Sequence, residues 1–478
     1  MASTIPGPQT AGPETPGRAD RAGAVEAHGI DVIPDAERHG RARDLFAVWA
    51  APNVSYLSLV VGGGLILLGL DLWQALAVIV AGNLFWALVG LVAVSGPASG
   101  TPSEVIMRAA FGIRGNRGNI LLTGWFASVC YLALNWAAGS LAAFTLVDEA
   151  GLRPSTPVKV AVIVAVAAAT LAISVYGHAT IVRLYLPFTL LLTAVFAVLT
   201  GCVLTRADWH YRPQQPLHGT ALAAALAAAL TLVASAPLSY NNSADFARYL
   251  PRDTRPAAVA GWTALGAYLP SVLFTFLGAV AGTALDMTDP QDALEAILPG
   301  WFRPAFLLAV VLSAMANNAM TAYSSGLALQ AVGLRLRRSR SVALDGAVGV
   351  ALTLYALLVS NFLATVTSVL ELMVVLMGPT LAIYATDVLL RRNRYDGQQL
   401  SDQAPGGPFW YRAGVNPAGI AALVAAAGAA ALCADNPLYT GPVARALGGV
   451  DLSLPVGVLG GAGVYAVVMR GRKGWLIR

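Results

Sequence analysis

The sequence predicts an all-α protein that crosses a membrane twelve times and keeps both chain ends on the same side. Of its 478 residues, 57% are hydrophobic and only 12% are charged, and the mean hydropathy is +0.66. Soluble domains carry about 25% charged residues, so this composition indicates a membrane protein. Apolar windows of about 20 residues, the length that spans a bilayer as a helix, recur twelve times along the chain.

The positive charges support this topology independently. The chain has 30 Lys and Arg residues, and all but six fall in tails and loops on the side of the N-terminus. Because positive loops stay in the cytoplasm, both termini are expected to face it, in an integral plasma (inner) membrane protein. The formal net charge of +5 reflects this bias, and no basic stripe with interleaved aromatics predicts nucleic-acid binding. The six exceptions are Arg153, Lys159, Arg206, Arg212, Arg303 and Arg445.

The windows divide the chain in order. Residues 1–43 are polar and rich in Pro, Gly and Ala, which predicts a disordered cytoplasmic tail and not a signal peptide. Residues 471–478 form a short cytoplasmic C-terminal tail. The predicted spans are 44–70, 73–96, 119–147, 157–176, 181–204, 220–249, 257–284, 302–332, 341–362, 363–390, 415–434 and 452–470.

The first and sixth spans share an interruption about halfway along. Pro52 is followed by Ser55 and Tyr56, and Pro237 is followed directly by Leu238, Ser239 and Tyr240. Proline removes a helical hydrogen bond, and irregular backbone at membrane depth occurs where it lines a cavity. The sequence therefore predicts discontinuous helices 1 and 6. The alternative is that the first proline opens an ordinary helix and that the asparagines after Tyr240 lie in a loop.

The two interruptions are five spans apart, which predicts an internal repeat. Because five is odd, the two copies have opposite orientations in the membrane. Residues 44–204 then form the first inverted repeat (spans 1–5), and residues 220–390 form the second (spans 6–10). Spans 11 and 12, residues 415–470, are rich in Ala and Gly and are expected to be peripheral.

Polar side chains gather near the middle of spans 1, 3, 6 and 8. Ser128, Tyr131 and Asn135 share one face of span 3, and span 8 carries Asn317 and Asn318 with a threonine one turn on. No Asp, Glu, Lys or Arg lies at the centre of these four spans. Aromatic rings with carboxamides suit a neutral, flat, hydrogen-bonding heterocycle. The alternative is that these side chains join helices and fill the bundle.

The reactive residue types point away from catalysis and metal binding. The three cysteines lie in apolar runs without pairing or metal-ligand spacing, and none of the five histidines lies in the middle of a span. No nucleophile or carboxylate pair faces the centre, so a membrane enzyme fits poorly. A channel would not need paired broken helices. We therefore expect no cofactor, no metal and no obligate protein partner.

Six stretches together resemble a known family. They are WAAPN, SGPASGTPSEVIMRAAFGIRGN, DFARYLPRDT, NAMTAYSSGLALQ, GPTLAIYATDVLLRRNRYD and FWYRAGVNPAGI. From about residue 44 to 420 the chain resembles the nucleobase–cation symporters, which include purine and cytosine permeases and hydantoin, allantoin and uracil relatives. The resemblance implies a LeuT-like five-plus-five inverted repeat. It also implies import of a neutral nucleobase-like heterocycle, cytosine or a purine first, by proton or sodium symport; hydantoin, allantoin, uracil or a vitamin-like heterocycle are alternatives.

The polar pattern and the resemblance together indicate the substrate-binding positions. Tyr131 stands where the family usually has tryptophan, and Ala236 stands where it usually has an aromatic residue, which implies a pocket of different size. The predicted positions are Val54, Ser55, Ser128, Tyr131, Asn135, Ser235, Ala236, Tyr240, Asn317, Asn318 and Thr321.

The resemblance also bears on the coupling ion. Sodium-dependent relatives bind the ion with two span 1 carbonyls, here near Ala51 and Val54, and with two span 8 hydroxyls. Those hydroxyl positions fall on Met315 and Ala316, and Ser313 is the only nearby substitute. A hard cation needs several oxygen ligands. The sequence therefore favours proton coupling over sodium coupling.

Glu371, about eight residues into span 10, is the candidate proton carrier. An ionised carboxylate at that depth costs a few kcal/mol, so burial favours the protonated form and makes the group able to exchange a proton. The alternative is a structural carboxylic acid bonded to a neighbouring helix.

Asp245 and Arg248 are expected to pair and shape an inner gate. Asp387 is expected to play a similar positional role beside Arg391 and Arg392.

Overall fold

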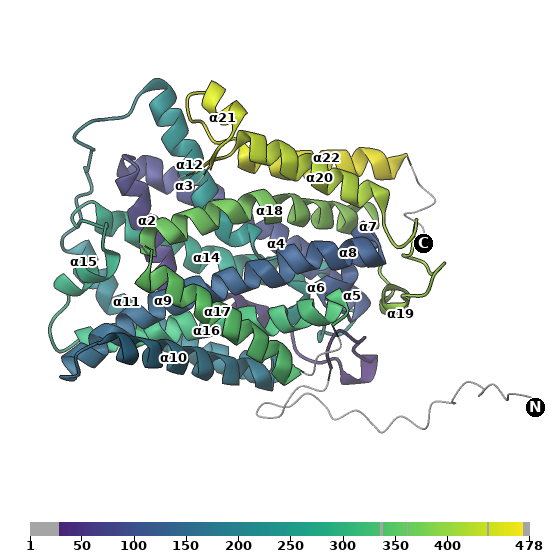
Figure 1. Ribbon diagram of the computed structural model, residues 1–478, viewed down its shortest axis with the longest axis horizontal. Coiled ribbons are helices and arrows are strands. Elements are labelled where there is room, and N and C mark those ends of the chain that lie inside the picture. Colours follow the sequence, from purple (N-terminus) through teal and green to yellow (C-terminus); the bar gives the residue numbers. More distant parts are fainter. Residues whose placement is uncertain (1–27, 335–337, 361, 437–438, 472–478) are drawn as a thin grey trace, which may run out of the picture.

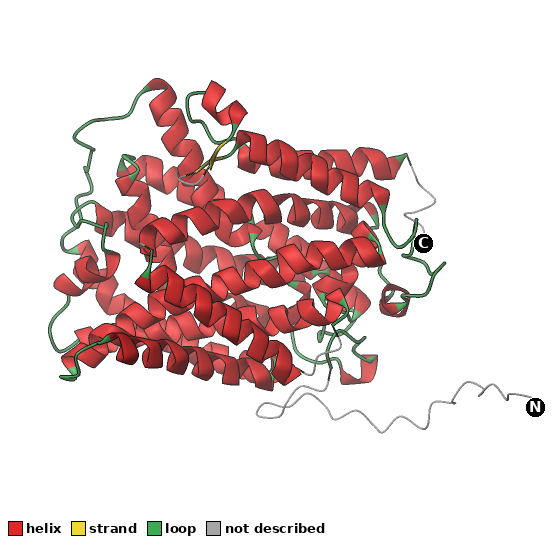
Figure 2. Cartoon of the chain, in the orientation of Figure 1, coloured by secondary structure: helices red, strands yellow, loops and turns green. Residues whose placement is uncertain are grey.

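The computed structural model describes residues 28–334, 338–360, 362–436 and 439–471, which form a bundle of long helices with one small hairpin (Figures 1 and 2). Ten described helices are long and apolar enough to cross a membrane, or eleven when one bent helix pair counts as a span. Pro417–Cys433 is a shorter apolar helix of 17 residues. The structure thus shows an all-helical protein with about ten apolar spans.

The first half of the chain alternates long helices with short ones. Its elements are η1 (Asp35–Glu37), α1 (Asp44–Asn53), α2 (Tyr56–Leu67), α3 (Leu72–Asn83), α4 (Trp86–Ala93), α5 (Ser95–Ser99), α6 (Ser103–Ile106), α7 (Arg108–Phe111), α8 (Ile113–Ile120), the π-helical turn η2 (Leu121–Phe126), α9 (Ala127–Glu149), α10 (Thr156–Tyr176) and α11 (His178–Leu204).

The second half has longer helices and the only hairpin among the described residues. Its elements are α12 (Gly219–Leu238), α13 (Ala244–Ala247), α14 (Pro256–Gly282), α15 (Pro290–Ala296), α16 (Arg303–Val332), α17 (Arg338–Leu358), α18 (Phe362–Leu390), α19 (Gly397–Ser401), α20 (Pro417–Cys433), β1 (Asp435–Asn436), β2 (Tyr439–Thr440), α21 (Pro442–Ala446) and α22 (Ser453–Arg470).

Figure 1 places the short elements at the two ends of the bundle. The helix α15 lies at one end, and α5, α7 and α19 lie at the other. The C-terminal helices α20 and α22 pack against each other and against α18, along one edge of the view. The helix α10 lies along the opposite edge. The polar side chains described below lie between these edges, on α1, α9, α12 and α16.

Span 1 is bent at the predicted interruption. The helices α1 and α2 meet at an angle of 55°, and Val54 and Ser55 between them leave the helical conformation. The Ser55 hydroxyl accepts a hydrogen bond from the Leu57 N–H at 3.2 Å and so caps α2. Serine is a favoured N-cap because its oxygen satisfies a helical N–H that has no partner in the helix. Two residues thus reorient the chain in the middle of an apolar stretch.

The long helix in predicted span 6 ends before the apolar window of residues 220–249 does. The helix α12 ends at Leu238, one residue after Pro237, and the four-residue α13 begins at Ala244. Residues 239–243 connect them as a turn. This connection carries Ser239 and Tyr240 just beyond the end of α12, where Ser239 contacts α9 and Tyr240 contacts α16.

Residues 28–43 differ from the expected disordered tail, and residues 1–27 lie outside the described residues. Ile33 is fully buried, and its N–H bonds the Gly100 carbonyl at 2.8 Å. Arg38 reaches the Pro97 carbonyl at 2.7 Å. This segment is ordered because the short apolar run around Ile33 packs beside α5, although the N-terminal segment as a whole is polar.

The helices α2 and α14 cross at van der Waals distance because each has a glycine at the contact. A Cβ on Gly278 would lie 2.1 Å from the Leu59 carbonyl oxygen, and one on Gly62 would lie 1.8 Å from the Thr275 carbonyl oxygen. Small residues of this kind let helix backbones approach closely in membranes. On the same helix as Gly278, Ser271 and Thr275 line a cavity together with residues of α2.

This crossing predicts the effect of a single methyl group. We expect Gly278→Ala to lower the free energy of unfolding by about 1–3 kcal/mol, because the added Cβ forces the two backbones apart. Gly261 on the same helix has open space around it, so Gly261→Ala is expected to be neutral or stabilising by about 0.5–1 kcal/mol. Thermal unfolding of the purified variants measures both. Equal unfolding temperatures for the two variants would contradict the predicted contact.

The outer surface of the bundle is apolar. Leu190 on α11, Leu273 on α14 and Val467 on α22 are 64%, 64% and 73% exposed. Large apolar side chains exposed on several helices are expected where lipid chains, and not water, surround the protein. Together with the apolar helix lengths, this surface identifies an integral, multi-pass membrane protein.

Candidate functional site

A cavity of about 60 Å³ lies between the broken span 1, the end of α12 and the middle of α9 and α16. No acidic, basic or histidine side chain is among the residues that line it. Its wall is instead made of hydroxyls, carboxamides, two tyrosines and aliphatic groups. The cavity can therefore hold a neutral polar molecule, but it offers no counter-charge to an ion.

Asn317 on α16 is the centre of the hydrogen bonding in this cavity. Its carboxamide oxygen accepts from the Asn135 amide at 3.4 Å and from the Tyr240 hydroxyl at 3.5 Å. Its amide nitrogen donates to the Pro52 carbonyl at 3.1 Å, just before the bend in span 1. Hydrogen bonds to oxygen are usually close to 2.9 Å, so the two accepted bonds are long and weak. A ligand that offers a better donor can replace them.

The ring of Tyr240 is held in place by two buried tryptophans. Its centroid lies 5.3 Å from that of Trp49 and 5.3 Å from that of Trp86. Both tryptophan side chains are fully buried. Aromatic pairs at this separation attract each other beyond the area they bury. Tyr240 is therefore a rigid wall whose hydroxyl points at Asn317.

Tyr131 on α9 is the opposite wall and is tied to the turn after α12. Its hydroxyl makes a short hydrogen bond with the Ser239 hydroxyl and a longer one, 3.4 Å, to the Ser235 carbonyl. Ser239 in turn donates to the same carbonyl at 2.5 Å. The ring position therefore depends on the loop that follows Leu238, so movement of that loop and movement of Tyr131 are linked.

A second, smaller cavity of about 30 Å³ adjoins the first on the side of α6 and α13. Tyr131 and Tyr240 line both cavities and separate them. The second cavity receives Thr123 and Gly124 from the π-helical turn η2, and one carboxyl group, that of Glu104. π-Helical turns are frequent at functional sites because they shift side chains by one position.

The structure brings most of the sequence-predicted binding residues to these two cavities. Two predicted positions line neither: Val54, whose carbonyl accepts from Ser313, and Asn318, whose amide donates to the Leu132 carbonyl at 2.8 Å. The residues that line at least one cavity are Ser55, Ser128, Tyr131, Asn135, Ser235, Ala236, Tyr240, Asn317 and Thr321.

Several lining residues were missed by the sequence analysis. Asn83 on α3, with Ser271 and Thr275 on α14, lines the larger cavity. Each is a lone polar residue, or an i, i+4 pair, inside an apolar window, and that signal could have identified them. Ser271 also donates to the Asn53 carboxamide oxygen at 2.8 Å, which joins α14 to the end of α1.

Of the predicted ion-binding positions, two sodium-site candidates lie in contact, whereas the proton-carrier candidate lies away from both cavities. The Ser313 hydroxyl donates to the Val54 carbonyl at 3.2 Å, so these two predicted sodium ligands do lie together. The Ala316 carbonyl accepts from the Tyr185 hydroxyl at 2.5 Å. Glu371 is buried but lines neither cavity, and its charged neighbours are Asp451 and Asp435 beside the hairpin.

The predicted inner gate is a polar contact between the N-terminal ends of α6 and α13. Asp245 is fully buried and accepts from the Ser103 N–H at 2.9 Å and from the Ser324 hydroxyl at 2.6 Å. Arg248 attracts it electrostatically, while bonding the Gly29 carbonyl at 2.6 Å and the Tyr323 hydroxyl at 3.0 Å. These contacts connect the N-terminal segment, α6, α13 and α16.

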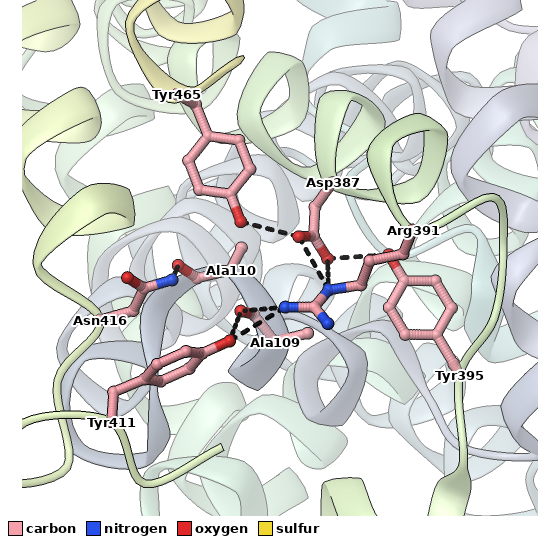
Figure 3. Close-up of polar contacts among 8 residues, drawn as sticks. All are labelled: Ala109, Ala110, Asp387, Arg391, Tyr395, Tyr411, Asn416 and Tyr465. Atoms are coloured by element: carbon pink, nitrogen blue, oxygen red, sulfur yellow. Dashed lines mark hydrogen bonds and ion pairs between the residues drawn. The ribbon is translucent and has the colours of Figure 1, made fainter. Parts of the chain in front are cut away.

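Asp387 at the end of α18 is the centre of a second buried network, shown in Figure 3. Its carboxylate accepts from the Arg391 guanidinium at 3.0 Å, from the Tyr395 hydroxyl at 2.8 Å and from the Tyr465 hydroxyl at 2.7 Å. Arg391 also bonds the Tyr411 hydroxyl at 3.0 Å. This network connects α18 with α22 and with the segment before α20.

Two further contacts fasten the same network to the short helix α7. The Tyr411 hydroxyl donates to the Ala109 carbonyl at 2.7 Å, and the Asn416 amide donates to the Ala110 carbonyl at 2.9 Å (Figure 3). Asn416 also caps α20 through the Ala418 N–H at 3.1 Å. The C-terminal helices are thereby anchored at the end of the bundle that carries α5 and α6.

Two solved structures share the fold over nearly the whole chain. Mhp1, a nucleobase-cation-symport-1 family transporter solved with bromovinylhydantoin bound, superposes with a TM-score of 0.73 at 19% identity, covering 93% of this chain and 95% of that one. A Na⁺-coupled sialic acid symporter superposes with a TM-score of 0.59 at 11% identity, covering 91% of each chain. The fold is therefore that of the Mhp1-like and LeuT-fold transporters.

Curated relatives give the same answer from the sequence. The chain is 27% identical over 467 residues to YxlA of Bacillus subtilis (strain 168), whose name assigns it to the purine-cytosine permeases; the match covers 94% of this chain and 96% of YxlA. It is 33% identical over 117 residues to the allantoin permease of the same organism, covering 23% of each. These relatives are transporters and not enzymes.

The family model for permeases of cytosine/purines, uracil, thiamine and allantoin matches residues 32–457. That range runs from the docked N-terminal segment to the start of α22 and includes both cavities. The chain therefore belongs to this family of nucleobase–cation symporters.

Proposed function

We propose that this protein imports a neutral nucleobase-like heterocycle, with cytosine or a purine as the first candidates, by cation symport and alternating access. Hydantoin, allantoin, uracil and a vitamin-like heterocycle are the alternatives within the same mechanism. The proposal includes twelve spans, with discontinuous helices 1 and 6 in an inverted repeat, and a plasma membrane location with both termini in the cytoplasm.

The observation that carries the proposal is the weakly bonded Asn317 carboxamide in an uncharged cavity. A carboxamide offers a donor and an acceptor side by side, which matches the N–H and C=O or N–H and N edge of a nucleobase. Asn317 already bonds the Pro52 carbonyl at the bend in span 1, so a ligand there contacts both repeats. The walls formed by Tyr131 and Tyr240 supply aromatic surfaces for stacking.

The volume of the cavity implies that the protein must move to bind. At about 60 Å³ it is far below the 300–1,000 Å³ typical of ligand sites, so a ring enters only when a wall shifts. Tyr131 separates this cavity from the smaller one, and its hydroxyl is hydrogen-bonded to Ser239 in the turn after α12. Movement of that turn would join the two cavities, which is the coupling between binding and opening that alternating access requires.

The proposal predicts saturable, ion-driven uptake. Purified protein in liposomes should accumulate at least one labelled neutral heterocycle from the set above when a proton or sodium gradient is imposed. Proton coupling is favoured, so a protonophore should abolish the accumulation and sodium should not restore it. Uptake that rises linearly with concentration, or that ignores both gradients, would contradict symport.

Glu371 is the proposed carrier of the coupling proton, and one substitution tests it. Glu371→Gln should abolish proton-driven accumulation but leave exchange of labelled for unlabelled substrate across the liposome membrane, because exchange needs no net proton movement. Glutamine keeps the size and the hydrogen bonding of the side chain. Unchanged pH dependence of accumulation in this variant would show that Glu371 does not carry the coupling proton and would favour a structural role beside Asp435 and Asp451.

A further inference from the structure

We propose that Glu104 and Asp245 form a proton-binding site that holds the inner gate closed beneath the substrate cavity. The inner gate is here the contact between Ser103–Glu104 of α6 and Asp245–Arg248 of α13 and its C-cap. The gating role in this inference rests on the proposed transport function. The proton site itself follows from the buried groups described below.

Two carboxyl groups meet in this contact. Glu104 is 2% exposed, Asp245 is fully buried, and the two side chains are within hydrogen-bonding reach of each other. Asp245 already accepts from the Ser103 N–H and the Ser324 hydroxyl, which supply donors to both of its oxygens. The second oxygen of Glu104 is buried and has no donor partner among the described residues. A proton on that oxygen, donated to Asp245, satisfies both groups.

Electrostatics favour the same arrangement. Burial, followed by the nearby charge of Asp245, holds the pKa of Glu104 well above the ordinary range of a glutamate. The charge of Arg248 acts in the opposite direction but does not outweigh burial, so the pKa of Glu104 stays raised. Two ionised carboxyl groups this close cannot both stay buried, so one of them holds a proton while the gate is closed.

The other titratable groups around the pair have hydrogen-bond partners of their own. Tyr384 on α18 faces both carboxyl groups and bonds the Ser95 hydroxyl at 2.7 Å, and the Tyr323 hydroxyl on α16 accepts from Arg248 at 3.0 Å. Arg108 on α7 turns away to the Leu400 carbonyl at 3.0 Å. The neighbouring helices α4, α5 and α19 contain no acidic or basic residue.

The position of the pair connects it to the substrate cavity. Glu104 lines the smaller cavity, whose other wall is formed by Tyr131 and Tyr240. The side chains of Asn241 and Asn242 line the same cavity, and each has one buried polar atom without a hydrogen-bond partner in the described structure. A volume of about 30 Å³ has room for one or two water molecules, which would give Glu104 a route for its proton.

The sign of the pH effect follows from linkage. The closed gate has a raised Glu104 pKa, and an open, hydrated gate returns it toward the ordinary value, so the closed state binds the proton more tightly. The closed state is therefore favoured at pH values below the ordinary pKa, and that preference is lost as pH rises toward the raised pKa. Within this window, each pH unit shifts the equilibrium toward the open gate by up to about tenfold.

A spectroscopic experiment tests the proton directly. The infrared C=O stretch of a protonated carboxylic acid should be present in the purified wild type at neutral pH and should disappear as pH is raised. Glu104→Gln should lack that band, so the wild-type-minus-variant difference spectrum should contain it, whereas Glu371→Gln should keep the band. Identical bands in the wild type and Glu104→Gln would overturn the proposal. If Glu104→Gln does not fold, Asp245→Asn should instead move the band's titration to lower pH, and an unmoved titration overturns the proposal.

Accessibility of the gate supplies a second readout. Met377 lines the smaller cavity on α18, so Met377→Cys, with the three native cysteines replaced by alanine, reports opening by its rate of maleimide labelling. The ratio of this rate to that of the same protein with Glu104→Gln removes the pH dependence of the thiol itself. That ratio should rise up to about tenfold per pH unit, and a flat ratio would overturn the proposal. Neither experiment uses a substrate, so a failure of heterocycle uptake and a failure of this inference are separate results.

Discussion

Asn317→Ala is expected to weaken the binding of the transported heterocycle by about tenfold to hundredfold, with a matching loss of uptake at low concentration. A well-made carboxamide pair with a base edge contributes about 1–3 kcal/mol of binding energy. Alanine removes both the donor and the acceptor, and it also leaves the Asn135 amide and the Tyr240 hydroxyl without their shared acceptor. Equilibrium binding to the purified variant measures the loss.

The matched control is the next residue on the same helix. Asn318 is the same residue type, but it bonds the Leu132 carbonyl and lines neither cavity. Asn318→Ala should therefore lower stability by about 1 kcal/mol and change the dissociation constant by less than about twofold. The reverse pattern, with normal binding in Asn317→Ala and lost binding in Asn318→Ala, would show that the helix faces the substrate with its other asparagine.

Asp387→Ala is expected to destabilise the protein by about 3–5 kcal/mol, enough to remove most of the folded protein from the membrane. The Asp387 and Arg391 side chains are each 1% exposed, and breaking a buried ion pair leaves an uncompensated charge. The hydroxyls of Tyr395 and Tyr465 lose their acceptor at the same time. The yield and unfolding temperature of the detergent-purified variant measure the effect.

An exposed aspartate nearby provides the comparison. Asp396 caps α19 by accepting from the Gln398 and Gln399 N–H groups and has no ion pair among the described residues. Asp396→Ala should cost about 1 kcal/mol, the usual worth of an N-cap. Equal losses in Asp387→Ala and Asp396→Ala would contradict the anchoring role given to the Asp387 network.

The sequence predicted the bend in span 1 because the physics there is local. Pro52 lacks a backbone donor, and Ser55 is a favoured helix cap, so both residues act through their immediate neighbours. The choice between Asn317 and Asn318 was not local. Consecutive helical residues point 100° apart, and an apolar window without charges does not fix the rotation of its helix. Only the packing of α16 against α9 decides which asparagine reaches the cavity.

The residues that the sequence missed depend on contacts between distant segments. Ser271 and Thr275 line the cavity beside residues of α2, and Gly62 and Gly278 mark the close approach of α2 and α14. Glu104 lies between two predicted spans, where a charged side chain is expected to be solvated. The structure buries it because α6 folds against α13 through the reciprocal hydrogen bonds of Ser103 with Ala244 and Asp245, which lie 141 and 142 residues further along the chain.

The uncharged cavity around Asn317 is proposed to bind a neutral heterocycle, and ligand binding to the purified wild-type protein is the decisive test. A panel of cytosine, purines, uracil, hydantoin and allantoin, with amino acids and nucleotides as charged comparisons, is measured by thermal stabilisation with and without sodium. We expect saturable stabilisation by at least one neutral heterocycle, none by the charged compounds, and loss of the effect in Asn317→Ala. Stabilisation by charged compounds alone, or heterocycle binding that Asn317→Ala leaves unchanged, would contradict it.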